Sequence, residues 1–147
     1  MSTNRSRRRQ GDNTLPSVQE IRHALRGKPV DAALCREVRE LVQLHRYRRS
    51  HPLKSSEIDC RRVELVAQID RRLDDSPAAS PPLRSLAHSS TVGALLDRMA
   101  AAAARALDKL VAGGPSDPAT RRAWGRVAEL EGRYAQLLDT ITVSLVS

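Results

Sequence analysis

The sequence predicts an all-α protein: an antiparallel bundle of four long helices, with a short N-terminal helix and a disordered basic N-terminal tail. Apolar residues recur at spacings of three and four along five segments, which is the helical period. No stretch alternates apolar and polar residues, and no hairpin turn is signalled. Aromatic residues make up 2% of the 147 residues, so the core must be built from Leu, Val, Ile and Ala. This length fits one domain, which we assign to residues 15–147.

The chain begins with a basic segment and a short helix. Residues 1–14 contain a single apolar side chain, Met1, and four arginines, so we expect a disordered tail. A short helix is expected to start at Ser17, because Ser17-Val-Gln-Glu20 forms a capping box. Gly27 is a natural residue to end it.

The next two helices are separated by a proline. The second helix is predicted to begin after Pro29 and to reach about Arg49, since Pro52 disfavours the helical conformation in the residue before it. The third helix is predicted to be capped by Ser55 or Ser56 and to run to about residue 75.

A Pro/Ser-rich connection at about residues 76–88 precedes the last two helices. It is long enough to cross the end of a bundle, so the order of the helices in space stays open. The fourth helix is expected from near Ser90 to just before Gly113-Gly114. The last helix has Asp117 as its cap and Pro118 at its first position, which is a favoured pair.

The last helix has a coiled-coil-like apolar seam. Its residues alternate by three and four: Val127, Leu130, Tyr134, Leu137 and Ile141. The seam is about three heptads long. It is typical both of a helix packed inside its own bundle and of a homodimer formed through the last helix, and the sequence leaves both open.

Three ionisable residues are predicted to face the core. On a helical wheel of 100° per residue, His45, Arg62 and Glu131 each fall on the apolar face of their helix. Because an unpaired charge there would be costly, we predict that Arg62 pairs with Glu131 and that His45 hydrogen-bonds in the same layer. Such a layer either fixes the helix register or forms a small-ligand or enzymatic site between helices.

The net charge of +8 lies in the first third of the chain. Residues 1–54 contain 13 Lys and Arg against 5 Asp and Glu, whereas residues 55–147 contain 12 of each. This asymmetry fits either solvated basic faces or an anionic partner. The candidate anion-binding residues are Arg5, Arg7, Arg8, Arg9, Arg46, Arg48, Arg49 and Lys54. The shortage of aromatics argues against a platform for stacking single-stranded bases.

Common signatures of chemistry are absent from the sequence. It contains no phosphate-binding glycine loop, no nucleophile elbow and no HExxH pair, and its histidines and cysteines fit no common zinc module. We therefore predict no metal and no cofactor, and two reduced cysteines, Cys35 and Cys60. No apolar run approaches the ~20 residues that span a bilayer, and no secretory signal is recognisable, so a cytoplasmic protein with no membrane contact is expected.

Three segments in this order resemble a known family. They are SEIDCRRVELVAQIDRRL at 56–73, STVGALLDRMA at 90–100 and RRAWGRVAELEGRYAQLLDTI at 121–141. Together with Leu44-His45, they resemble the small helical bacterial proteins catalogued as domain of unknown function 4254. The likeness covers roughly residues 15–142. The positions that match the family pattern are Leu44, His45, Arg61, Arg62, Glu64, Asp70, Thr91, Gly93, Asp97 and Arg98. The chain departs from that pattern at Cys60 and at Arg71-Arg72-Leu73.

The family has no established activity, so the resemblance implies a fold and leaves function open. We expect a non-enzymatic protein-interaction or accessory module with an unknown protein partner. One alternative is sequence-independent nucleic-acid binding through the basic N-terminal third. The second alternative is a small-ligand or enzymatic site at the layer of His45, Arg62 and Glu131.

Overall fold

The computed structural model describes residues 15–74 and 91–146 of the 147-residue chain. Within these ranges it is all-α, which confirms the predicted fold class. The helices are α2 (Val18–Leu25), α3 (Ala33–Ser50), α4 (Ser55–Asp74), α6 (Val92–Gly113) and α7 (Pro118–Val146), with a 3₁₀ turn, η1 (Pro52–Lys54), between α3 and α4. The predicted disordered tail and the Pro/Ser-rich connection lie outside the described residues.

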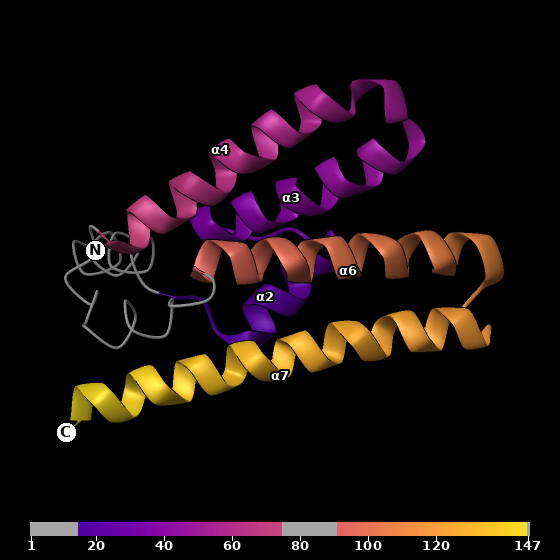
Figure 1. Cartoon of the computed structure of the whole chain (residues 1–147). Helices are drawn as coiled ribbons and strands as arrows, with labels where there is room; N and C mark the ends of the chain where they lie inside the picture. Colours follow the sequence, from indigo (N-terminus) through magenta and orange to yellow (C-terminus); the bar gives the residue numbers. More distant parts are fainter. Residues whose placement is uncertain (1–14, 75–90, 147) are drawn as a thin grey trace.

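The four long helices form two antiparallel hairpins, one of α3 and α4 and one of α6 and α7 (Figure 1). Helix α6 is the central element, because it contacts α2, α3, α4 and α7. Its small residues permit this: Ala100, Ala103, Ala104 and Ala106 are fully buried, so neighbouring helices approach its backbone closely. Helix α4 packs on α3 and α6 along one side of the bundle, while α7 packs on α6 and α2.

Most helix ends follow the local signals in the sequence. The Ser17 hydroxyl accepts a hydrogen bond from the Glu20 amide at 3.2 Å, and the Glu20 carboxylate accepts one from the Ser17 amide at 3.4 Å. The Asp117 carboxylate accepts from the Ala119 amide at 2.9 Å at the start of α7. Gly27 follows α2 with a φ of 74°, a backbone conformation that glycine adopts without strain.

The predicted serine cap of α4 is wrong. Ser55 has helical backbone angles, φ −56° and ψ −38°, because η1 leads directly into α4. An N-cap residue needs an extended backbone, so Ser55 is already the first helical residue and Ser56 lies inside the helix. Pro52 ends α3 as predicted, but the proline also fits the first position of a new helical turn.

The buried core of the described residues consists of aliphatic side chains with Met99, Cys35 and one aromatic residue, Tyr134. Tyr134 is fully buried, and its hydroxyl donates a 2.6 Å hydrogen bond to the carbonyl oxygen of Pro16, which ties α7 to the segment before α2. Burial raises the pKa of Tyr134 above its ordinary value, so the hydroxyl stays a donor. Val127 and Leu130 are buried in the same core. This part of the α7 seam therefore packs within its own chain.

Both cysteines are free thiols on helices. Burial raises the pKa of the Cys35 thiol to about 11, so it stays protonated at neutral pH. Cys60 is exposed on α4. Among the described helices, none combines the length and the apolar character that a membrane crossing requires.

Candidate functional site

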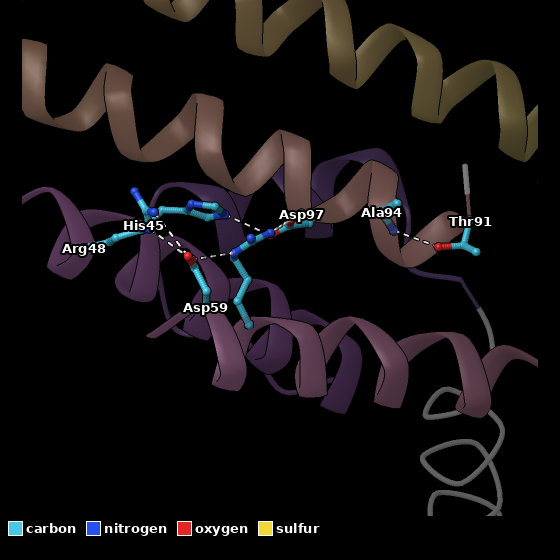
Figure 2. Close-up of polar contacts among 7 residues, drawn as sticks. His45, Arg48, Asp59, Thr91, Ala94 and Asp97 are labelled. Carbon is cyan, nitrogen blue, oxygen red and sulfur yellow. Dashed lines mark hydrogen bonds and ion pairs between the residues drawn. The ribbon is translucent and has the colours of Figure 1, made fainter. Parts of the chain in front are cut away.

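Asp97 on α6 accepts hydrogen bonds from two other helices. His45 Nε2 on α3 lies 2.8 Å from Asp97 Oδ1, and Arg62 Nη1 on α4 donates to Asp97 Oδ2 (Figure 2). A carboxylate can only accept, so Nε2 is the protonated ring nitrogen of His45. The contact between α3, α4 and α6 therefore centres on one carboxylate, whose side chain is 14% exposed.

The contacts around Asp97 continue towards the surface. Arg62 Nε lies 3.5 Å from Asp59 Oδ1 on the same helix. Arg48 on α3 donates two hydrogen bonds to the two oxygens of Asp59, at 3.0 and 3.1 Å. We call these five residues, His45, Arg48, Asp59, Arg62 and Asp97, the Asp97 network. Its two carboxylates alternate with its three basic side chains, so each charge faces an opposite or hydrogen-bonding neighbour.

The network holds its carboxylates in the ionised form. Burial alone would raise the pKa of Asp97, but the hydrogen bonds and positive charges of His45 and Arg62 outweigh it and hold the pKa below its usual range. The hydrogen bonds from Arg48 chiefly lower the pKa of Asp59. Both groups are thus charged at neutral pH.

The predicted pair of Arg62 and Glu131 is wrong. Glu131 on α7 is 4% exposed, and its two oxygens face Arg22 on α2 at 2.8 Å and Arg26, the residue after α2, at 3.3 Å. Arg26 also lies over the ring of Trp124, 4.8 Å from its centre. The wheel gave the inward direction of Glu131 correctly, but α7 packs beside α2 and α6. The structure brings His45 and Arg62 together and places Glu131 in a separate ion-pair cluster.

Glu131 supports a stability prediction. Replacing it with Gln removes the negative charge and one of the two acceptor oxygens, and leaves Arg22 or Arg26 facing an amide nitrogen. We expect the free energy of unfolding to fall by about 1–2 kcal/mol, measured by urea denaturation. Glu129→Gln is the control, since Glu129 is exposed on the same helix, and it should change stability by less than about 0.5 kcal/mol. Equal effects of the two substitutions would contradict this role of Glu131.

The described candidate anion-binding arginines pair with carboxylates of their own chain. Arg46 and Arg49 both contact Asp108 on α6 at 3.1 Å, and Arg48 contacts Asp59. Lys54 on η1 is exposed, and no described carboxylate pairs with it. The other four candidates, Arg5, Arg7, Arg8 and Arg9, lie outside the described residues. The basic surface predicted around residues 46–54 is therefore largely neutralised where the structure describes it.

Glu37, whose side chain is 11% exposed, lies between α3 and α4. Arg72 Nη1 is 2.6 Å from Glu37 Oε1, but the geometry is that of an ion pair without a hydrogen bond. Burial raises the pKa of Glu37, and Arg72 opposes this shift. The adjoining cavity, of about 220 Å³, has both acidic and basic residues in its lining, including Glu40 and Arg61, which pair at 3.0 Å. Its charges are largely balanced by each other.

The wheel missed Asp97, the acceptor that organises the network. At 100° per residue Asp97 lies about 140° from Val92, off the apolar stripe of its helix. It faces protein because α6 is surrounded by neighbours on several sides, which a single-stripe pattern does not reveal. The available signal was the family resemblance, whose matching positions include His45, Arg62 and Asp97. Gly93 and Asp70, two further positions of that resemblance, are also in contact. The Gly93 amide donates a hydrogen bond to Asp70 Oδ1 at 2.8 Å.

Within residues 15–74 and 91–146, no group of three or more His, Cys, Asp and Glu side chains has the geometry to hold a metal ion. The pairing of His45 with Asp97 is the arrangement that orients a general base in many enzymes. Here, however, both oxygens of Asp97 are also the contact points that join three helices. No family model, curated protein or solved structure matches the chain.

Proposed function

We propose that this chain is a non-enzymatic binding module, an interaction or accessory protein, in which the Asp97 network has a structural role. The observation that supports this most directly is that both oxygens of Asp97 are engaged by side chains of its own chain. A catalytic acid or base must transfer a proton to or from a substrate. In this chain, Asp97 instead accepts hydrogen bonds from His45 and Arg62. Their positions on three different helices suit a clamp that sets helix register.

The Arg62 side chain supports the same proposal. It bridges two carboxylates, Asp59 and Asp97, and both of them also accept hydrogen bonds from α3. A substrate anion at this place would have to displace one of these contacts. The cavity beside Glu37 and another between α6 and α7 are both lined by residues other than those of the network.

The test compares the wild-type chain with His45→Gln as baits in affinity capture from the native organism, followed by reconstitution with the purified partner. We expect the same partner to bind both baits, because a structural clamp is not the contact surface. Sedimentation velocity should show a complex with the partner and also whether the chain alone forms a dimer. The result is to be compared at a temperature where both baits are folded.

A metabolite screen by thermal shift tests the alternative that the network binds a small ligand. A ligand that raises the melting temperature of the wild type and not that of folded His45→Gln would place a ligand at the network. That result would overturn the structural role and favour the small-ligand or enzymatic alternative.

The remaining expectations stay predictions. Nucleic-acid binding through the first third rests on the segment before residue 15, because Arg46, Arg48 and Arg49 already have carboxylate partners. A homodimer through α7 would need residues other than Val127, Leu130 and Tyr134, which are buried in the chain's own core. Membership of the family catalogued as domain of unknown function 4254 likewise stays a prediction.

A further inference from the structure

A basic cavity of about 290 Å³ lies between α6 and α7, whose side-by-side course is visible in Figure 1. Its charged lining consists of Arg105 and Lys109 from α6 and of Arg122 and Arg126 from α7. The other lining residues are alanines, and none of the lining residues is acidic. The cavity is separate from the Asp97 network and outside the segment to which the sequence assigned anion binding.

The hollow exists because small residues stand where the helices face each other. Ala102, Ala119 and Ala123 line it, and their methyl groups do not fill the space between the two helices. Ala102 and Ala123 also pack against the hydrophobic core, so the floor of the cavity is apolar. Positive side chains therefore surround a small apolar floor.

The arrangement of charge around this cavity is unfavourable for the protein alone. Arg105 and Lys109 are four residues apart on one helix, and Arg122 and Arg126 are four apart on the other. Like charges at this spacing repel and weaken a helix. Two such pairs on adjacent helices gather four positive charges around one volume.

Little negative charge compensates this group. Arg126 pairs with Glu129 at 3.0 Å, but both side chains are exposed, so the pair is weak. No described carboxylate forms an ion pair with Arg105, Lys109 or Arg122. Asp108, the acid next to Lys109 on α6, pairs with Arg46 and Arg49 of α3. An uncompensated cluster of this kind indicates a negatively charged occupant.

We propose that the α6–α7 cavity binds a small oligophosphate or phosphate ester with at least two negative charges. Arginine guanidinium groups match phosphate oxygens in geometry, and lysine adds a mobile point charge. The volume lies near the lower end of the range for small-ligand pockets, about 300–1,000 Å³. The proposal is independent of the function proposed above.

Isothermal titration calorimetry of the full chain with inorganic pyrophosphate at ~50 mM salt tests the proposal. We expect saturable binding, weakened at least about tenfold by Arg105→Gln combined with Arg122→Gln. The matched control combines Arg71→Gln with Arg133→Gln, two exposed residues outside the cavity, and removes the same net charge. The control should stay within about twofold of the wild type. Equal weakening by both double variants, or no binding by the wild type, overturns the proposal.

Ala119→Leu tests the cavity itself without changing charge. Leucine is a good helix former, and its side chain at this position would occupy the hollow. We expect pyrophosphate binding to be lost while the protein still unfolds cooperatively. Binding by Ala119→Leu at wild-type strength would overturn the proposal. If one of the variants fails to fold, the other decides the question.

A gel shift with a short DNA duplex at ~50 and ~200 mM salt separates a small ligand from a nucleic acid. No shift, together with pyrophosphate binding, supports the proposal. A shift that is lost in the Arg105/Arg122 double variant but retained by Ala119→Leu would assign these cations to a nucleic-acid surface. That outcome would overturn the small-ligand proposal.

Discussion

Replacing Asp97 with Asn is expected to lower the free energy of unfolding by about 2–4 kcal/mol, the largest loss of the polar substitutions considered. Asparagine offers one acceptor oxygen and one NH₂ group. One of the two donors, His45 or Arg62, would therefore face another donor in a half-buried contact between three helices. Urea denaturation at neutral pH measures the effect. Asp139→Asn, an exposed change on α7, should remain within about 0.5 kcal/mol of the wild type.

The same residue gives a pH dependence with a defined sign. The pKa of Asp97 is lower in the folded chain than its ordinary value of about 3.9. Its contribution to stability is therefore complete above that value and is lost as the pH falls through the folded pKa. We expect the difference in stability between wild type and Asp97→Asn to be large at pH 7 and to shrink at pH 3 and below. A difference that stays constant down to the lowest pH at which both variants fold would contradict this role of Asp97.

Replacing Gly93 with Ala is expected to lower the free energy of unfolding by about 1–3 kcal/mol. Gly93 lies in the first turn of α6, where its helix meets α4. A Cβ there would be 2.8 Å from the carbonyl oxygen of Val66 and 2.8 Å from Asp70 Oδ1. The Val66 oxygen is a backbone atom inside α4, so the two helices would have to move apart. The hydrogen bond from the Gly93 amide to Asp70 would be strained by the same movement.

Gly132→Ala is the matched control for Gly93→Ala. Gly132 is also helical, but a Cβ there would have no neighbour within 4 Å. Alanine should therefore raise the free energy of unfolding by about 0.5–1 kcal/mol, through the lower backbone entropy of the unfolded chain. The two substitutions are thus expected to have opposite signs in thermal or urea denaturation. Two changes of the same sign would show that α4 and α6 are not held at the distance described.

Helix α6 contributes charged residues to two different arrangements, the Asp97 network and the α6–α7 cavity. In the network, each basic side chain has a carboxylate partner of the same chain, and the result is a contact that holds α3, α4 and α6 together. At the cavity, four positive side chains lie close together, and only Arg126 has a carboxylate partner among the described residues. Pairing within the chain favours a structural role, whereas uncompensated charge favours a ligand. The two proposals follow from this difference.

The basic third of the chain shows why charge counts along a sequence mislead. The count of charges along the chain predicted an anion-binding surface in the N-terminal third. However, Arg46 and Arg49 pair with Asp108 on α6, and Arg48 pairs with Asp59 on α4. The segment after residue 54 is neutral in total, yet four of its basic residues line one cavity that has no acidic residue in its lining. A cluster of positive charge could form there that no sum along the chain would detect.

The sequence by itself determined the helices, because the signals that start and stop them are local. Ser17 with Glu20, Gly27, Pro52, and Asp117 with Pro118 act within a few residues, so their effects can be predicted without knowing the neighbours. For α3 and α7, the apolar periodicity also indicated which side of the helix is buried. It placed His45 and Glu131 in contact with other helices, as the structure has them.

The tertiary structure alone decided which charged residues meet. Arg62 contacts Asp97, 35 residues away, and Arg22 contacts Glu131, 109 residues away. A wheel gives the direction of a side chain but not the helix that it faces, and that depends on how the two hairpins pack around α6. Where two helices face each other with alanines, as at Ala119 and Ala102, the same packing also leaves a cavity. Partners and cavities are properties of pairs of helices, and for that reason they cannot be obtained from one helix at a time.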